Sequence, residues 1–191
     1  MLIFPDVIRN WFLGLYILAL LSVVAMSIYL QVERKNIEKQ EGPLPSPGIL
    51  IPLGIPLFIL ITRIGEITVG WFYMRWMGLG LSVYFLVILP WFMITLGRFA
   101  VPGQALYQDH KLITHGPYSF VRHPLYSAAI ALWFGAALGT ANWLLMGLFP
   151  LLVIIILRFP VRQEETLMNE KFGAAYKKYS ENTPRIIPGL W

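Results

Sequence analysis

The chain has 191 residues, of which 57% are hydrophobic and only 13% are charged, and its mean hydropathy is +0.64. Soluble domains average about 45–50% apolar and about 25% charged residues, so the composition excludes a soluble globular domain, a disordered chain and a disulfide-rich scaffold. The absence of cysteine excludes thiol catalysis and thiolate metal sites. The net charge of +5 does not indicate nucleic-acid binding, because no basic cluster is separated from apolar sequence. These features indicate an integral membrane protein.

The first and third apolar runs each predict one transmembrane helix. Residues 11–30 contain no charge and are long enough to cross about 30 Å of hydrocarbon. Residues 31–41 are polar and lead into a segment rich in proline and glycine, residues 42–48, so we expect a loop there. The third run, residues 77–96, contains Pro90, which we expect to kink the helix rather than to end it.

The second apolar run begins at Ile49 and leaves two alternatives for its end. The helix ends near Ile61, or it continues to about Tyr73. In the longer version Arg63 and Glu66 lie three residues apart and pair on one helix face. The sequence pattern fits both alternatives.

The last apolar block, residues 126–157, is too long for one ordinary span and is interrupted at residues 139–142. It predicts two short helices in a tight hairpin, in which Gly135 and Gly139 allow the helices to approach closely. The predicted fold is therefore an all-α membrane protein with about five transmembrane helices, forming one membrane domain over residues 1–191.

Basic residues predict the orientation of these spans. Twelve of the 15 lie in the first loop, the third loop (residues 97–125) and the tail after the last span, whereas Arg9, Arg63 and Arg75 fall on the other side. By the positive-inside rule the N-terminus lies outside, and the third loop and the tail lie in the cytoplasm.

The third loop contains a motif of histidines, prolines and tyrosines. It runs from His110 through Gly116-Pro117-Tyr118 to Arg122-His123-Pro124-Leu125-Tyr126. Gly116-Pro117 predicts a turn, and Pro124 suits the first turn of the next helix, where a missing N–H is harmless. Taken singly, these residues are also typical of a capping turn with a snorkelling arginine and an interfacial tyrosine.

The tail predicts one amphipathic helix. Val161, Met168, Phe172, Tyr176 and Tyr179 recur at helical spacing and form an apolar stripe. Two acidic residues stand near this stripe. At 100° per residue Glu165 falls inside it and Glu164 at its edge, so both carboxylates need partners. The alternative is an interfacial helix whose acidic side chains reach water.

Together the loop and tail motifs resemble the isoprenylcysteine carboxyl methyltransferase family and the related phospholipid N-methyltransferases. The shared features are His-Lys-Leu-Ile, Gly-Pro-Tyr, Arg-His-Pro-x-Tyr, Glu-Glu-x-x-Leu, Phe-Gly-x-x-Tyr-x-x-Tyr and a terminal Pro-Arg-x-x-Pro, and they cover residues from about 97 to 188. The first three spans, residues 1–96, match only in being apolar. The resemblance implies that residues 97–191 are the catalytic half, in which the cytoplasmic loop and the tail helix form a cofactor pocket.

The resemblance implies S-adenosylmethionine as cofactor and S-adenosylhomocysteine as product. The Glu164 carboxylate would form an ion pair with the ammonium group of the cofactor. Gln104 stands one residue away from the spacing of a family glutamine. The family's cofactor contacts fall on Gln104, His110, Lys111, Leu112, Ile113, Tyr118, His123, Pro124, Leu125, Tyr126 and Glu164.

The substrate arginine of the family lies four residues before the tail acid, and Pro160 occupies that place here. Arg158 and Arg162 flank it, and the substrate role stays open between them. We expect Glu165 to pair with one of these two arginines. A carboxylate acceptor is already ionised and needs no base, whereas an amine or thiol must lose a proton, for which Glu165, His123 and Tyr126 are candidates. Methyl transfer of this kind needs no metal.

The methyl acceptor implied by the resemblance is lipophilic and reaches the cytoplasmic face through the bilayer. A prenylcysteine carboxylate is the first choice, and a phosphatidylethanolamine-type lipid or a small thiol is the alternative. An NADPH-dependent membrane reductase has a similar tail, and a non-enzymatic carrier would need more ionisable residues within the spans. We expect membrane lipids as partners, and neither nucleic acid nor an obligate protein partner.

Overall fold

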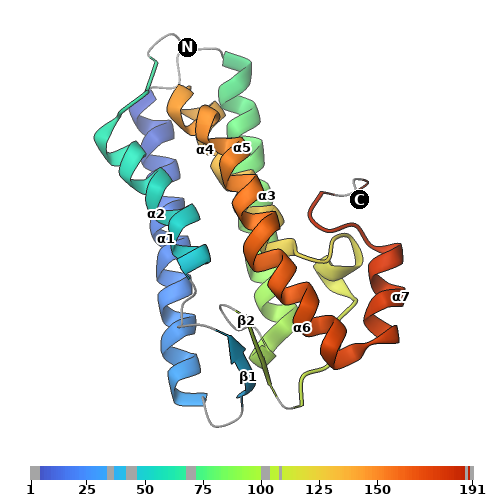
Figure 1. The fold of residues 1–191 in the computed structure, drawn as a ribbon. Helices are drawn as coiled ribbons and strands as arrows, with labels where there is room; N and C mark the ends of the chain where they lie inside the picture. The colour runs from blue at the N-terminus through green and yellow to red at the C-terminus, as the bar shows by residue number, and fades with distance from the viewer. Residues whose placement is uncertain are drawn as a thin grey trace.

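The computed structural model describes residues 5–33, 37–41, 47–67, 72–99, 104–107, 109–187 and 189, and the chain is largely helical there (Figure 1). In chain order the elements are α1 (Pro5–Glu33), β1 (Ile37–Glu41), α2 (Pro47–Thr62), α3 (Phe72–Leu96), the 3₁₀ turn η2 (Gly97–Phe99), β2 (Gln104–Tyr107), the 3₁₀ turn η3 (Gly116–Ser119), α4 (Pro124–Gly139), α5 (Trp143–Ile156), the π-helical turn η4 (Leu157–Val161), α6 (Arg162–Phe172) and α7 (Ala174–Asn182).

Apolar helices dominate the fold, as the composition predicts. Within the described residues two helices are long and apolar enough to cross a membrane, Tyr73–Leu96 and Trp143–Phe172, and α4 is apolar but shorter. Large apolar side chains point outward from them, including Ile94 on α3, which is 80% exposed, and Ile154 on α5. An outer surface of this kind suits lipid rather than water, so the structure indicates a membrane protein.

The shorter alternative for the second helix is correct. Helix α2 ends at Thr62, and the next residue, Arg63, has a left-handed backbone with φ of 59° that an α-helix cannot continue through. The Arg63 guanidinium pairs with Asp6 at the start of α1 rather than with Glu66. Glu66 instead forms an isolated β-bridge with Asn142, in the turn between α4 and α5. Tertiary contacts therefore decide where this helix stops.

The last apolar block forms the two helices that its interruption predicts, but the glycines have another role. A Cβ atom on Gly135 would lie 2.9 Å from the carbonyl oxygen of Gly78 in α3, and one on Gly139 would lie 2.5 Å from the Phe12 ring of α1. The expectation that these glycines bring α4 close to α5 is therefore wrong. They bring α4 against α3 and α1, because the small residues lie on the face of α4 that points toward those helices.

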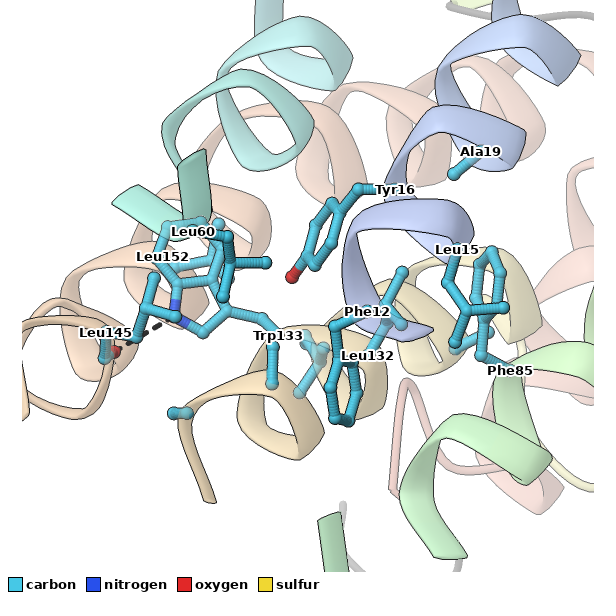
Figure 2. Close-up of a cluster of buried hydrophobic side chains, with 14 of the residues drawn as sticks. Phe12, Leu15, Tyr16, Ala19, Leu60, Phe85, Leu132, Trp133, Leu145 and Leu152 are labelled. Carbon is cyan, nitrogen blue, oxygen red and sulfur yellow. Dashed lines mark hydrogen bonds between the residues drawn. The ribbon is translucent and has the colours of Figure 1, made fainter. Parts of the chain in front are cut away.

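Side chains from helices α1 to α5 meet in one apolar cluster (Figure 2). Phe12 and Tyr16 of α1 are almost completely buried there, and so is Trp133 of α4. The Trp133 indole N–H donates to the carbonyl of Leu145 in α5 at 3.0 Å, so this buried polar group is satisfied. The cluster fixes α4, and with it the first turn of α4, relative to the rest of the bundle.

Parts of the polar first loop and of the third loop, both predicted to be loops throughout, pair in a short antiparallel sheet. Strand β1 pairs with β2, with Ile37 opposite Tyr107 and Glu41 opposite Gln104. The two strands form because distant segments pair with each other, and a local polarity pattern does not reveal such pairing. The sheet lies at the end of the bundle from which α6 extends, away from the turn at residues 63–67 (Figure 1).

The tail departs from the single amphipathic helix expected from Val161 to Tyr179. The helix that starts as α5 continues through Pro160 by a π-helical turn and then as α6, which ends at Phe172. Gly173 follows with φ of 50°, and α7 leaves in a new direction (Figure 1). A positive φ at this glycine breaks the helix, which lets α7 fold back beside the third loop.

We predict that Gly78→Ala destabilises the bundle. Its Cβ would lie 2.5 Å from the Gly135 carbonyl oxygen and 2.6 Å from the Gly139 nitrogen, both backbone atoms that cannot rotate away. Overpacking of this kind costs about 1–3 kcal/mol. Gly80→Ala is the control, because on the same helix its Cβ meets nothing within 4 Å. Thermal unfolding in detergent should show a lower midpoint for the first variant only, and equal midpoints would contradict the close contact.

Candidate functional site

The third loop ends in a capped helix start. Pro124 begins α4 as predicted, and His123 is its N-cap residue. The backbone N–H of Arg122 donates to the carbonyl of Pro184 at 2.8 Å, and that of His123 donates to the carbonyl of Arg185 at 3.0 Å. Residues 183–187 therefore lie along the two residues that precede α4 and accept hydrogen bonds from their backbone N–H groups. We call residues 183–187 the tail segment.

Glu164 joins the loop motif to the tail motif. The Tyr126 hydroxyl donates to Oε1 of Glu164 at 2.6 Å, and Nδ1 of His123 lies 3.2 Å from Oε2. His123 and Tyr126 stand three residues apart at the first turn of α4, so both face the same carboxylate. The Glu164 side chain is 26% exposed. The structure thus brings together three residues for which the sequence implies a cofactor role.

Glu165 is the more buried of the two acids, as the helical wheel predicts, but its partners differ from those expected. Nη1 of Arg122 lies 3.2 Å from Oε1, and Arg185 binds both oxygens, with Nη2 2.9 Å from Oε2 and Nε 3.2 Å from Oε1. The expected pairing of Glu165 with Arg158 or Arg162 is therefore wrong. Both of those side chains are exposed, since the buried face of α6 is turned toward the loop and the tail segment.

His123 lies between the two acids and is nearly buried. Its Nε2 is 3.5 Å from Oε1 of Glu165, within ion-pair distance. Burial alone would lower the pKa of His123, but hydrogen bonds and charges from Glu164 and Glu165 outweigh it and raise the pKa above its usual value. The imidazole therefore holds a proton more readily than a free histidine and supplies positive charge to Glu164.

His110 has the opposite environment. Its ring lies 4.8 Å from the Phe99 ring and 6.2 Å from that of Phe172 in α6. Burial and the positive charge of Lys171, partly opposed by the negative charge of Asp109, together lower the pKa of His110 to about 4. The ring is therefore neutral at physiological pH, and its buried Nδ1 has no hydrogen-bond partner within the described residues.

The other residues predicted to contact the cofactor differ in their exposure. Lys111 is exposed, Leu112, Ile113 and Leu125 are partly buried, and Pro124 is buried. Tyr118 is partly buried, and its carbonyl accepts a hydrogen bond of 2.7 Å from the Tyr179 hydroxyl of α7. Gln104 begins strand β2, and its side chain lies outside the part of the chain that the structure describes.

Sequence reasoning gave no site role to Arg122, Arg185 or Tyr179, although all three stand within quoted motifs. Arg122 was interpreted as a snorkelling side chain, and Arg185 appeared only as part of a terminal pattern. The useful signal was the buried acid at position 165, which requires a cation. The missing information was which distant segment supplies that cation.

Comparisons with known proteins match the part of the chain that contains these residues. The sequence model of the phospholipid methyltransferase family matches residues 73–175, which include almost all of α3, the helices α4 and α5, and the α6 residues Glu164 and Glu165. A probable protein-S-isoprenylcysteine O-methyltransferase of Oryza sativa subsp. indica is 30% identical over 125 residues, or 64% of this chain and 65% of the relative.

Two further relatives match a shorter region. The protein-S-isoprenylcysteine O-methyltransferase of Schizosaccharomyces pombe is 31% identical over 81 residues, or 42% of this chain and 34% of the relative. One from Arabidopsis thaliana, named B, is 28% identical over 81 residues, or 42% of this chain and 41% of the relative. The chain thus aligns with about a third to two thirds of the length of these curated relatives.

Proposed function

Because the chain belongs to the phospholipid methyltransferase family, whose model matches more than half of it, we propose that it is a membrane methyltransferase that uses S-adenosylmethionine. The observation that carries this proposal is the contact of His123 and Tyr126 with Glu164. It joins the two sequence segments in which the family resemblance lies. The relatives named above are O-methyltransferases of isoprenylcysteine proteins.

The residues of the site fit the proposed cofactor, which supplies an activated methyl group on a sulfonium when bound. Both arginines of the cluster pair with Glu165, so Glu164 keeps a partly exposed carboxylate for the cofactor's ammonium group. The buried Nδ1 of His110 lacks a hydrogen-bond partner among the described residues. Its ring is neutral and lies near two phenylalanine rings, and an unpaired polar atom in apolar surroundings suits a flat heterocycle. Leu112 and Ile113 add apolar surface.

We propose the carboxylate of a prenylcysteine-like lipid as the acceptor. An amine or thiol would have to lose a proton, and three side chains are candidates for taking it. Glu165 is paired with two guanidiniums, the carboxylates of Glu164 and Glu165 favour the already protonated form of His123, and the Tyr126 hydroxyl donates to Glu164. None of the three is set to act as a base, which favours an acceptor that is already ionised. Exposed Arg158 or Arg162 would orient it by a bidentate contact.

The five-span arrangement and its orientation belong to the same proposal. The N-terminus lies outside, and the third loop and tail lie in the cytoplasm. The contact of the tail segment with the start of α4 supports a common side for both, and 12 of the 15 basic residues fall in the segments assigned to that side. At that membrane face the site receives a soluble cofactor from one direction and a lipid from the other.

We expect S-adenosylmethionine, but not NADPH, to raise the melting temperature of the purified protein. At a hundredfold excess over the Kd, ligand binding stabilises the native state by about 2.7 kcal/mol. Glu164→Gln should lose most of this gain, since the ammonium group would lose its counter-charge. Glu181→Gln, at an exposed position on α7, is the matched control. Stabilisation by NADPH alone would favour the reductase alternative.

The acceptor is identified by the product of methyl transfer. Vesicles containing a prenylcysteine with a free carboxylate, phosphatidylethanolamine and a small thiol would be incubated with the enzyme and methyl-labelled S-adenosylmethionine. We expect label in a methyl ester of the prenylcysteine that alkali releases as methanol, as measured by mass spectrometry. Label in the phospholipid amine or in the thiol would contradict the proposed acceptor.

The proposed topology is open to labelling, because the chain has no cysteine of its own. Single cysteines at Ser119 and Ser180 should react with an impermeant maleimide from the cytoplasmic side of oriented vesicles. A cysteine at Asn10, near the start of α1, should react from the opposite side. Reaction of Ser119→Cys and Ser180→Cys from different sides would overturn the composite site.

A further inference from the structure

Arg185 is attached to the site by two independent sets of contacts. Its guanidinium binds both oxygens of Glu165, and its backbone carbonyl accepts the hydrogen bond from the N–H of His123. The neighbouring carbonyl, of Pro184, accepts from Arg122. One residue of the tail segment therefore holds the acid of α6 and the backbone at the start of α4 at the same time.

The charges in this cluster are divided unevenly. Arg122 and Arg185 both pair with Glu165, whereas Glu164 is held by the His123 imidazole and the Tyr126 hydroxyl. The imidazole lies within ion-pair distance of both acids, at 3.2 Å from Glu164 and 3.5 Å from Glu165. The two arginines thus compensate the charge of Glu165, which would otherwise attract the imidazole away from Glu164.

We propose that Arg185 is a positioning residue: by occupying Glu165 and fixing the backbone of His123, it directs the His123 ring to Glu164. Its role rests on the function proposed above, because Glu164 is the proposed partner of the cofactor's ammonium group. Arg185 acts through Glu165 and His123 and is not itself a catalytic residue. Nothing in the motif alone assigns it this role, since it stands 20 residues after the acid that it binds.

The proposal makes a specific statement about the titration of His123. Glu164 and Glu165 of α6 and Tyr126 of α4 lie next to its ring. Arg122 of the loop and Arg185 of the tail segment are charged groups that bind the neighbouring Glu165 carboxylate. Removing the positive charge of Arg185 leaves Glu165 with one guanidinium. The imidazole should then be drawn toward Glu165 and hold its proton to higher pH.

The test is NMR titration of the three histidines in protein labelled only at histidine, with no cofactor or acceptor present. His110→Gln and His115→Gln assign the signal of His123. In Arg185→Gln the midpoint of His123 should rise by roughly one pH unit, the size expected for one charge removed at several ångströms in a partly screened site. Lys177→Gln, an exposed change of the same charge on α7, should leave it unchanged.

Arg185→Lys separates charge from geometry. Lysine keeps the charge but cannot form the bidentate contact, so the His123 midpoint should return most of the way to the wild-type value. The amide hydrogens of Arg122 and His123 should still exchange faster than in the wild type, because the tail segment is held less firmly. This second measurement keeps the test informative if Arg185→Gln does not fold.

An unchanged His123 midpoint in folded Arg185→Gln, or an equal rise in Lys177→Gln, would overturn the proposal. So would wild-type exchange of both amides in Arg185→Lys. Because the titration uses neither cofactor nor acceptor, its failure is distinct from failure of the proposed methyl transfer. If the His123 midpoint shifts as expected but the protein does not bind S-adenosylmethionine, the proposed function is rejected and the positioning role of Arg185 stands.

Discussion

The compensation of a buried carboxylate, Glu165, is the interaction on which the polar end of this protein depends. A carboxylate that is 9% exposed is costly to bury without a counter-charge, and a broken buried pair costs about 3–5 kcal/mol. The two guanidiniums that meet it come from the third loop and from the tail segment, at Arg122 and Arg185. One acid on α6 therefore holds together segments that are far apart in sequence, and these are the segments that carry the family motifs.

The apolar bundle gives this polar cluster a fixed base. Close contacts at Gly78, Gly135 and Gly139 set the position of α4 against α3 and α1, and the buried cluster around Trp133 joins α4 to α5. Because α5 continues through a π-helical turn into α6, the same bundle fixes the direction in which α6 leaves. Helices α4 and α6 each contribute one half of the Glu164 contact. The tight packing of small residues in the bundle thus determines the geometry of groups that lie outside it.

The two adjacent acids have different electrostatic roles. Glu165 is paired with two arginines and joins the third loop to the tail segment. Glu164 contacts the His123 imidazole and the Tyr126 hydroxyl and stays partly exposed. This division suits the proposed binding of a cationic cofactor, because Glu164 can pair with the cofactor while Glu165 keeps its structural contacts. The family resemblance implies a substrate arginine at the position of Pro160, and Arg158 and Arg162, which flank this proline, are both exposed.

The sequence by itself determined the apolar helices, the hairpin after Tyr126 and the need for partners at both acids, because hydropathy and helical period depend only on neighbouring residues. It left the end of α2 open, since the residues around Arg63 fit a turn as well as a helix, and it missed the pairing of β1 with β2. Only the tertiary structure decided that Arg122 and Arg185, rather than Arg158 or Arg162, neutralise Glu165. The break at Gly173 turns the chain back toward α4. Segments that meet only after such a turn can form a charge pair, but the spacing of residues in the sequence does not predict it.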